Sequence, residues 1–140
     1  MQELAPILVA EDDQTDIMIL QMAARQAALA HPLVFVSDGS QAINYLGGEP
    51  PFTDRLRHPL PVLLILDLKM PIMTGFDVLS WLSTRTELKH LPAVVLTSSS
   101  SESDIAKARQ LGASDYHVKP HRIADLVGLL QSINKRWLSC

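Results

Sequence analysis

The chain has 140 residues, which is enough for one domain with a single hydrophobic core. Its residues are 47% hydrophobic and 19% charged, as in an ordinary folded globule, and its net charge of −3 lacks the basic excess that nucleic-acid binding requires. No apolar stretch reaches membrane-spanning length, no signal-peptide pattern is present, and the one cysteine, Cys140, excludes an internal disulfide. We therefore expect a cytoplasmic protein with no direct nucleic-acid or membrane partner.

The first sixty residues predict two strand–helix units and a loop. An apolar run over residues 6–10 predicts a buried strand that ends in three acidic residues, 11–13. From 13 to about 30, apolar residues recur every three or four positions, which predicts an amphipathic helix. Residues 33–36 predict the next strand, followed by a short helix that two glycines end. The four prolines in residues 49–61 predict a loop without a regular element.

The second half repeats the same alternation. It predicts strands at 63–66, 93–96 and 114–118, and helices at 75–84, at 101–111 and from Ile123 to the end. The run at 63–66 is typical of a central parallel strand buried on both faces, and it ends at Asp67. Ser101 and Asp104 have the spacing of a helix capping box. Five alternating units predict an α/β fold, a three-layer αβα sandwich around a five-stranded parallel sheet.

Polar residues close four of the five predicted strands. They are Glu11, Asp12, Asp67, Thr97 and Lys119. Because the carboxyl ends of parallel strands share one edge of the sheet, these side chains are expected to meet in one crevice. Clustered carboxylates repel one another, and a hard cation such as Mg²⁺ relieves that repulsion through oxygen ligands. A carboxylate beside such an ion can attack phosphorus and form an acyl phosphate.

Each of these residues also has an ordinary explanation. Asp67 suits a turn or a helix N-cap, and Asp12 suits a helix N-terminus. Thr97 is an ordinary β-branched strand residue, and Lys119 an ordinary exposed strand end. Their coincidence at the ends of successive strands favours the functional interpretation.

Four motifs carry a resemblance that covers nearly the whole chain. They are residues 7–13, residues 66–71 with Gly75, residues 95–98 and residues 116–120. In their order and spacing the chain resembles the receiver domain of bacterial two-component response regulators. The resemblance implies one receiver domain over residues 1–140, with the flavodoxin-like strand order 2-1-3-4-5.

The resemblance also implies a role for each acidic residue. Asp67 is the expected phosphoacceptor. Asp12 is expected to bind Mg²⁺ directly, and Glu11 to assist through water. Asp67 and the main-chain carbonyl of Lys69 would complete the protein ligands of the ion.

Four more residues receive roles in the same way. Lys119 is expected to pair with the phosphoryl group, and its bond to Pro120 to be cis. Thr97 is expected to move toward the phosphate, and Tyr116 to turn inward into the vacated space. An ordinary strand aromatic is the alternative interpretation of Tyr116.

The implied function is signalling by contact. A sensor histidine kinase would pass its phosphoryl group to Asp67, and the fourth helix, fifth strand and fifth helix would then present a changed surface to a downstream protein. The loop at 49–61, the hydroxyl run at 97–100 before Asp104, and the ending at Trp137 are similar to single-domain regulators that partner phytochrome-like kinases. Such regulators often form homodimers, although we expect Trp137 to close the last helix against the core. The ending at Cys140 suggests a natural tail rather than an excised domain.

Three rival interpretations remain. A haloacid-dehalogenase phosphatase would have Asp-x-Asp-x-Thr after the first strand, but this chain has Glu11 at the nucleophile position and no room for a cap domain. A flavodoxin-like carrier would need a phosphate cradle there, which three acids would repel. A docking module without phosphorylation would not need Asp67, Thr97 and Lys119 together. We therefore expect a signalling protein rather than an enzyme.

Overall fold

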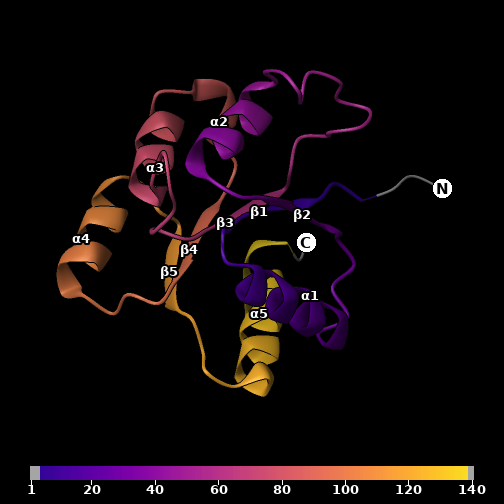
Figure 1. The fold of residues 1–140 in the computed structure, drawn as a ribbon, viewed down its shortest axis with the longest axis vertical. Coiled ribbons are helices and arrows are strands. Elements are labelled where there is room, and N and C mark those ends of the chain that lie inside the picture. The colour runs from indigo at the N-terminus through magenta and orange to yellow at the C-terminus, as the bar shows by residue number, and fades with distance from the viewer. Residues whose placement is uncertain (1–3, 139–140) are drawn as a thin grey trace.

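The structure is a computed structural model that describes residues 4–138, so Cys140 lies outside the described residues. Strands and helices alternate along the described chain (Figure 1). The elements are β1 (Ile7–Ala10), α1 (Gln14–Gln26), β2 (Leu33–Val36), α2 (Gly39–Gly47), β3 (Leu63–Leu66), α3 (Gly75–Ser83), a 3-10 turn (Thr86–Leu88), β4 (Ala93–Thr97), α4 (Glu102–Gln110), β5 (Asp115–Val118) and α5 (Ile123–Trp137).

The strands form one parallel sheet with the order β2-β1-β3-β4-β5. Both the three-layer fold and the strand order expected from the sequence are confirmed. Because every pair of neighbours is parallel, the carboxyl ends of all five strands lie at the same edge of the sheet.

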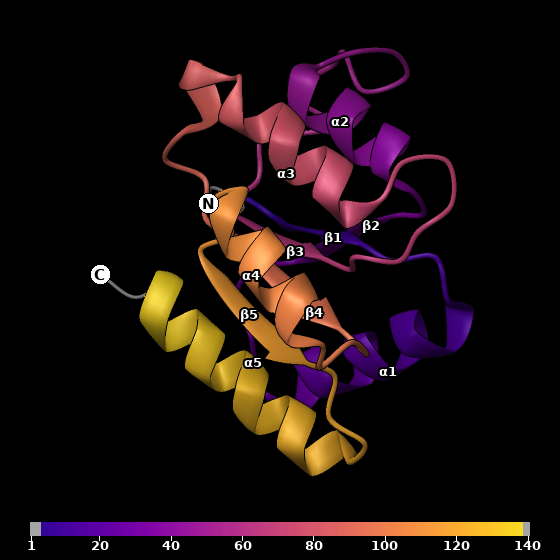
Figure 2. The ribbon, with the colours of Figure 1, turned by 90° about the vertical axis from the view of Figure 1, so that its left-hand side faces the viewer.

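Helices cover both faces of the sheet, with α2, α3 and α4 on one side and α1 and α5 on the other (Figures 1 and 2). The strand β3 contributes to both layers of core. Leu64 and Leu66 pack under α2, α3 and α4, whereas Leu63 and Ile65 face α1 and α5. All four side chains are buried, as expected for a central strand.

Helix α1 is shorter than the sequence pattern predicted. It ends at Gln26, and Ala27 is its C-cap, whereas the apolar spacing suggested a helix to about residue 30. The reason is Ala28, whose φ of 56° is left-handed and cannot continue a right-handed helix. A short irregular segment over residues 29–32 then leads into β2.

The expected capping box at α4 is only half formed. The Ser101 side chain accepts a hydrogen bond from the Asp104 amide at 3.4 Å, but the Asp104 carboxylate accepts from the Ser99 hydroxyl at 2.6 Å instead. A complete capping box occurs at α3, where Thr74 and Asp77 bond each other's backbone amides.

The loop at residues 49–61 contains no helix or strand, as predicted, but it is firmly anchored. The Arg55 guanidinium donates to the carbonyls of Tyr45 at 2.8 Å and Leu46 at 3.0 Å, which lie in the last turn of α2, and to that of His58 at 3.2 Å. A cation at this position bonds carbonyls at the C-terminal end of the helix, where the helix itself supplies few donors.

The last helix closes on the core, as expected. Trp137 is half-buried and packs against the apolar cluster between the sheet, α1 and α5. None of the helices in the described part of the chain has the length and hydropathy needed to span a bilayer.

Candidate functional site

Backbone hydrogen bonds at the carboxyl edge extend the sheet just beyond the strands and fix three charged residues there. The Glu11 amide donates to Val36 at 3.0 Å, and the Asp67 amide donates to Ala10 at 3.1 Å. At the same edge, between β4 and β5, the Lys119 amide donates to the Thr97 carbonyl at 2.7 Å. The ladder therefore sets the positions of Glu11, Asp67 and Lys119 relative to one another.

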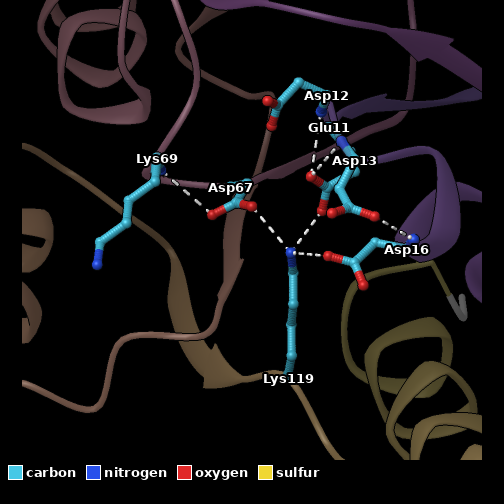
Figure 3. Close-up of polar contacts among 7 residues, drawn as sticks. All are labelled: Glu11, Asp12, Asp13, Asp16, Asp67, Lys69 and Lys119. Atoms are coloured by element: carbon cyan, nitrogen blue, oxygen red, sulfur yellow. Dashed lines mark hydrogen bonds and ion pairs between the residues drawn. The ribbon is translucent and has the colours of Figure 1, made fainter.

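The Lys119 ammonium lies at the centre of this edge and donates to three carboxylates (Figure 3). The distances from Nζ are 2.6 Å to Glu11 Oε1, 2.7 Å to Asp16 Oδ2 and 2.8 Å to Asp67 Oδ2. Glu11 and Asp67 were predicted from the sequence. Asp16, in the first turn of α1, was missed, because a lone acid at that position is usually explained by the helix dipole.

Burial and charge shift two pKa values in this cluster. Burial raises the pKa of Glu11 to about 7, and the nearby Asp67 carboxylate raises it too, against the opposing effect of Lys119. Burial alone would lower the pKa of Lys119, but its hydrogen bonds to Asp16, Asp67 and Glu11 outweigh that effect and raise it. Lys119 is thus a permanent cation, while the protonation of Glu11 changes near neutral pH.

Three carboxylates at this edge have the geometry of a cation site. One carboxylate oxygen from each of Glu11, Asp12 and Asp67 lies within 4.8 Å of the others. Asp12 is exposed, whereas Glu11 and Asp67 are buried. An all-oxygen donor set with one solvent-facing member suits a hard divalent cation that keeps part of its water shell. The acidic residues present therefore fit a divalent metal ion.

The role expected for the Lys69 carbonyl in this site stays a prediction. The Lys69 amide donates to Asp67 Oδ1 at 3.2 Å, which keeps the residue close to the acceptor. Its side chain points away from the acidic cluster (Figure 3).

Thr97 ends β4 in an unusual state for a buried hydroxyl. The residue is fully buried, and its Oγ1 has no hydrogen-bond partner among the described residues. Buried hydroxyls are nearly always paired, so an unpaired one at a strand end suits a group that receives a ligand oxygen later. Thr97 does not contact Asp67 through any hydrogen bond in this structure.

Tyr116 connects β5 to the segment that follows Thr97. Its ring packs against the core under α3 and α4, and its hydroxyl donates to the Ser99 carbonyl at 2.9 Å. The Ser99 hydroxyl in turn donates to Asp104 in α4. Tyr116 is therefore tied to the β4–α4 segment, and its movement on phosphorylation stays a prediction.

The loop after Asp67 is held by close backbone contacts. Gly75 donates to the Leu68 carbonyl at 3.0 Å, and a Cβ on Gly75 would lie only 2.4 Å from the Asp67 carbonyl oxygen. Gly39 donates to Met73 at 3.1 Å. Glycine is thus required at residue 75, because any side chain would push against the backbone of the acceptor.

One expectation about this edge is wrong. The Lys119–Pro120 bond is not cis, and Pro50–Pro51 is the cis bond among the described residues. The trans form is the lower-energy isomer of an X–Pro bond, and the Lys119 ammonium reaches all three carboxylates from it.

Comparison with known proteins identifies similar chains. The family model for the response regulator receiver domain matches residues 7–131. The chain is 31% identical over 132 residues to response regulator Rcp1 of Synechocystis, a match that covers 94% of this chain and 88% of Rcp1.

Solved structures give the same result. Response regulator RPA3017 from R. palustris, described in red-light signalling, has a TM-score of 0.92 and 37% identity over 97% of this chain and 95% of its own. The phosphorylated cyanobacterial phytochrome response regulator RcpA has a TM-score of 0.87 and 32% identity, with 96% and 94% covered. The Mn²⁺-bound form of Rcp1 has a TM-score of 0.84 and 30% identity, with 97% and 96% covered.

Proposed function

The chain belongs to the response regulator receiver family of two-component systems, and we propose that Asp67 accepts a phosphoryl group from the phosphohistidine of a sensor kinase. Members of this family bind a divalent metal, and we propose Mg²⁺ as the ion that the reaction requires. The proposed role is stoichiometric signalling and not enzymatic turnover, because the phosphoryl group stays on the chain that received it.

One observation carries the proposal. The Asp67 carboxylate contacts the Lys119 ammonium at 2.8 Å. It also forms the candidate cation site together with Glu11 and Asp12. This pairing keeps Asp67 beside the positive charge that a phosphoryl group needs when it arrives. Lys69 also holds the second oxygen of Asp67 through its amide, which limits rotation of the carboxylate.

The chemistry follows from this arrangement. A bound Mg²⁺ would supply positive charge at the phosphoryl oxygens. An oxygen of Asp67 attacks phosphorus in line, the new P–O bond forms, and the P–N bond to the donor imidazole breaks with its electron pair going to nitrogen. Lys119 remains protonated and moves a hydrogen bond to a phosphoryl oxygen. The buried Thr97 hydroxyl has a free proton to donate to another.

We propose that the response is a shift between two conformations. Thr97 would approach the phosphoryl group, and Tyr116 would reset its contact with Ser99. The surface formed by α4, β5 and α5 would then differ between the two states. Helix α4 suits this role because Ala108 is its one buried residue, so little core packing opposes its movement.

The partners follow from the relatives. RcpA is a phytochrome response regulator by its description and Rcp1 resembles this chain over most of its length, so we propose a phytochrome-like sensor kinase as the donor. The exchange would occur in the cytoplasm, where ATP charges the kinase. The output would be contact with a downstream protein, and a homodimer is part of the proposal. The net charge of −3 argues against direct binding to nucleic acid.

Phosphorylation by a small donor tests the proposal. Incubation with acetyl phosphate and Mg²⁺ should add one phosphoryl group by intact-mass spectrometry, and Asp67→Asn should abolish the addition. EDTA should also prevent it. Repeated turnover of a phosphomonoester would instead indicate a phosphatase, and an unmodified wild-type chain would leave only a docking role.

A further inference from the structure

Asp16 is the third acidic partner of Lys119, beside Glu11 and Asp67. It lies in the first turn of α1, where its amide donates to the Asp13 side chain at 3.0 Å. This bond caps the start of the helix, and the Asp16 carboxylate contacts the Lys119 ammonium at 2.7 Å (Figure 3). Asp16 is not one of the carboxylates that form the candidate cation site.

The hydrogen-bonding capacity of Lys119 is fully used in this structure. An ammonium has three N–H donors, and those of Lys119 go to Glu11, Asp16 and Asp67. Phosphorylation of either Asp67 oxygen removes the negative charge of the carboxylate, so Oδ2 becomes a weaker acceptor for Lys119. The reaction therefore frees the Lys119 N–H that bonds Asp67. The Glu11 and Asp16 carboxylates are chemically unchanged and keep their bonds to Lys119.

One side of the Asp16–Lys119 pair faces apolar side chains. A small cavity beside it is lined by side chains of α1, β4 and α5, including Leu20, Leu96 and Leu126. The Lys119 side chain is 19% exposed, and that of Asp16 is 34% exposed. A lysine with a flexible four-carbon stem in such a setting depends on its polar partners for a fixed direction.

We propose that Asp16 is a positioning residue for phosphoryl transfer. Asp16 and Glu11 each accept one Lys119 N–H and so fix the direction of the ammonium. The third N–H, which bonds Asp67 in this structure, is then in position to bond an oxygen of the incoming phosphoryl group. The inference rests on the proposed function of Asp67. In the step itself the P–O bond to Asp67 forms, the bond from phosphorus to its donor breaks, and Lys119 keeps all three protons. Asp16 lies outside the candidate cation site and contacts the Lys119 ammonium, so the proposed effect acts through Lys119.

The test compares four variants with wild type. Asp16→Ala removes the acceptor, Asp16→Asn keeps its shape without its charge, and Asp16→Glu restores the carboxylate. Asp13→Asn is the matched control, because it removes a neighbouring exposed charge while asparagine still caps α1. The phosphorylation rate is measured over a range of acetyl phosphate concentrations at saturating Mg²⁺. Mg²⁺ binding to each variant is measured separately by calorimetry, and folding by circular dichroism.

We expect the phosphorylation rate to fall roughly three- to tenfold in Asp16→Ala, less in Asp16→Asn, and little in Asp16→Glu. Mg²⁺ affinity and the rate of Asp13→Asn should match wild type. A structural role alone would lower folding and Mg²⁺ binding as well, and would contradict the proposal.

Two other outcomes also overturn it. If Asp16 merely repelled the donor's charge, both Asp16→Asn and Asp13→Asn would react faster than wild type. If all variants react like wild type, Asp16 does not position Lys119. Failure of wild type itself to react would instead refute the proposed function, so the two failures are distinguishable.

Discussion

Lys119 and Arg55 are two cations at opposite edges of the sheet, and each donates hydrogen bonds to three oxygen acceptors. Lys119 contacts three carboxylates at the carboxyl edge. Arg55 contacts three backbone carbonyls where α2 leads into the loop before β3, at the amino edge. The two sites have similar numbers of contacts but different partners.

The difference lies in what the partners can do. Backbone carbonyls carry no net charge, cannot be protonated near neutral pH and do not bind phosphoryl groups, so Arg55 fixes a loop. Carboxylates can bind a metal, take up a proton or attack phosphorus, so the partners of Lys119 can change while the lysine stays. Removing the first cation should therefore reduce stability, and removing the second should reduce phosphorylation.

The largest effect is expected for Lys119→Ala. Loss of the ammonium removes the protein cation nearest to Asp67, and the rate of phosphorylation by acetyl phosphate should fall at least about a hundredfold. Denaturation by urea in Mg²⁺ should show that the variant is folded. A phosphorylation rate within threefold of wild type would contradict this prediction, because Lys119 would then contribute only to structure, as Arg55 does.

The next effect is expected for Arg55→Met. This change removes three hydrogen bonds to backbone carbonyls, and the free energy of unfolding should fall by about 2–3 kcal/mol in urea denaturation. The phosphorylation rate should be unchanged. The exposed Arg57 is a matched control, since Arg57→Met removes the same charge from the same loop and should cost less than about 0.5 kcal/mol. Equal losses in the two variants would show that Arg55 does not anchor the loop.

The smallest effect concerns pH. The pKa of Glu11 is about 7 in the folded chain and 4.5 ordinarily, so between these values the folded state binds more protons than the unfolded state. Without metal, this contribution favours folding below pH 4.5, declines as pH rises to about 7, and is constant above it. Relative to Glu11→Gln, the unfolding free energy of wild type should fall progressively as pH rises across that range. A difference that does not vary with pH would contradict the assignment.

Sequence alone located most of the site because the fold rule is simple. Residues that close parallel strands share one edge, so Glu11, Asp67 and Lys119 could be brought together without coordinates. Asp16 could not, because its role depends on the direction in which α1 leaves β1. Arg55 could not either, because the loop at 49–61 has no periodicity that would predict which side chain turns back to α2.

The remaining errors have local causes. The end of α1 depends on a left-handed alanine, Ala28, a residue that carries no strong turn signal. At α4, the Asp104 carboxylate could accept either from the Ser101 backbone amide, which would complete the capping box, or from the Ser99 hydroxyl. In the structure it accepts from Ser99. The isomer of the Lys119–Pro120 bond was inferred from the resemblance, and the structure has the trans form.

The most direct test of the account is to locate the phosphoryl group chemically. Borohydride reduces an acyl phosphate of aspartate to homoserine, which peptide mass spectrometry assigns to one residue. After treatment with acetyl phosphate and Mg²⁺, we predict homoserine at residue 67, and none when EDTA replaces Mg²⁺. Homoserine at Asp12 or Asp16, or the reduced glutamate product at Glu11, would contradict the assignment of Asp67 as the acceptor held by Lys119.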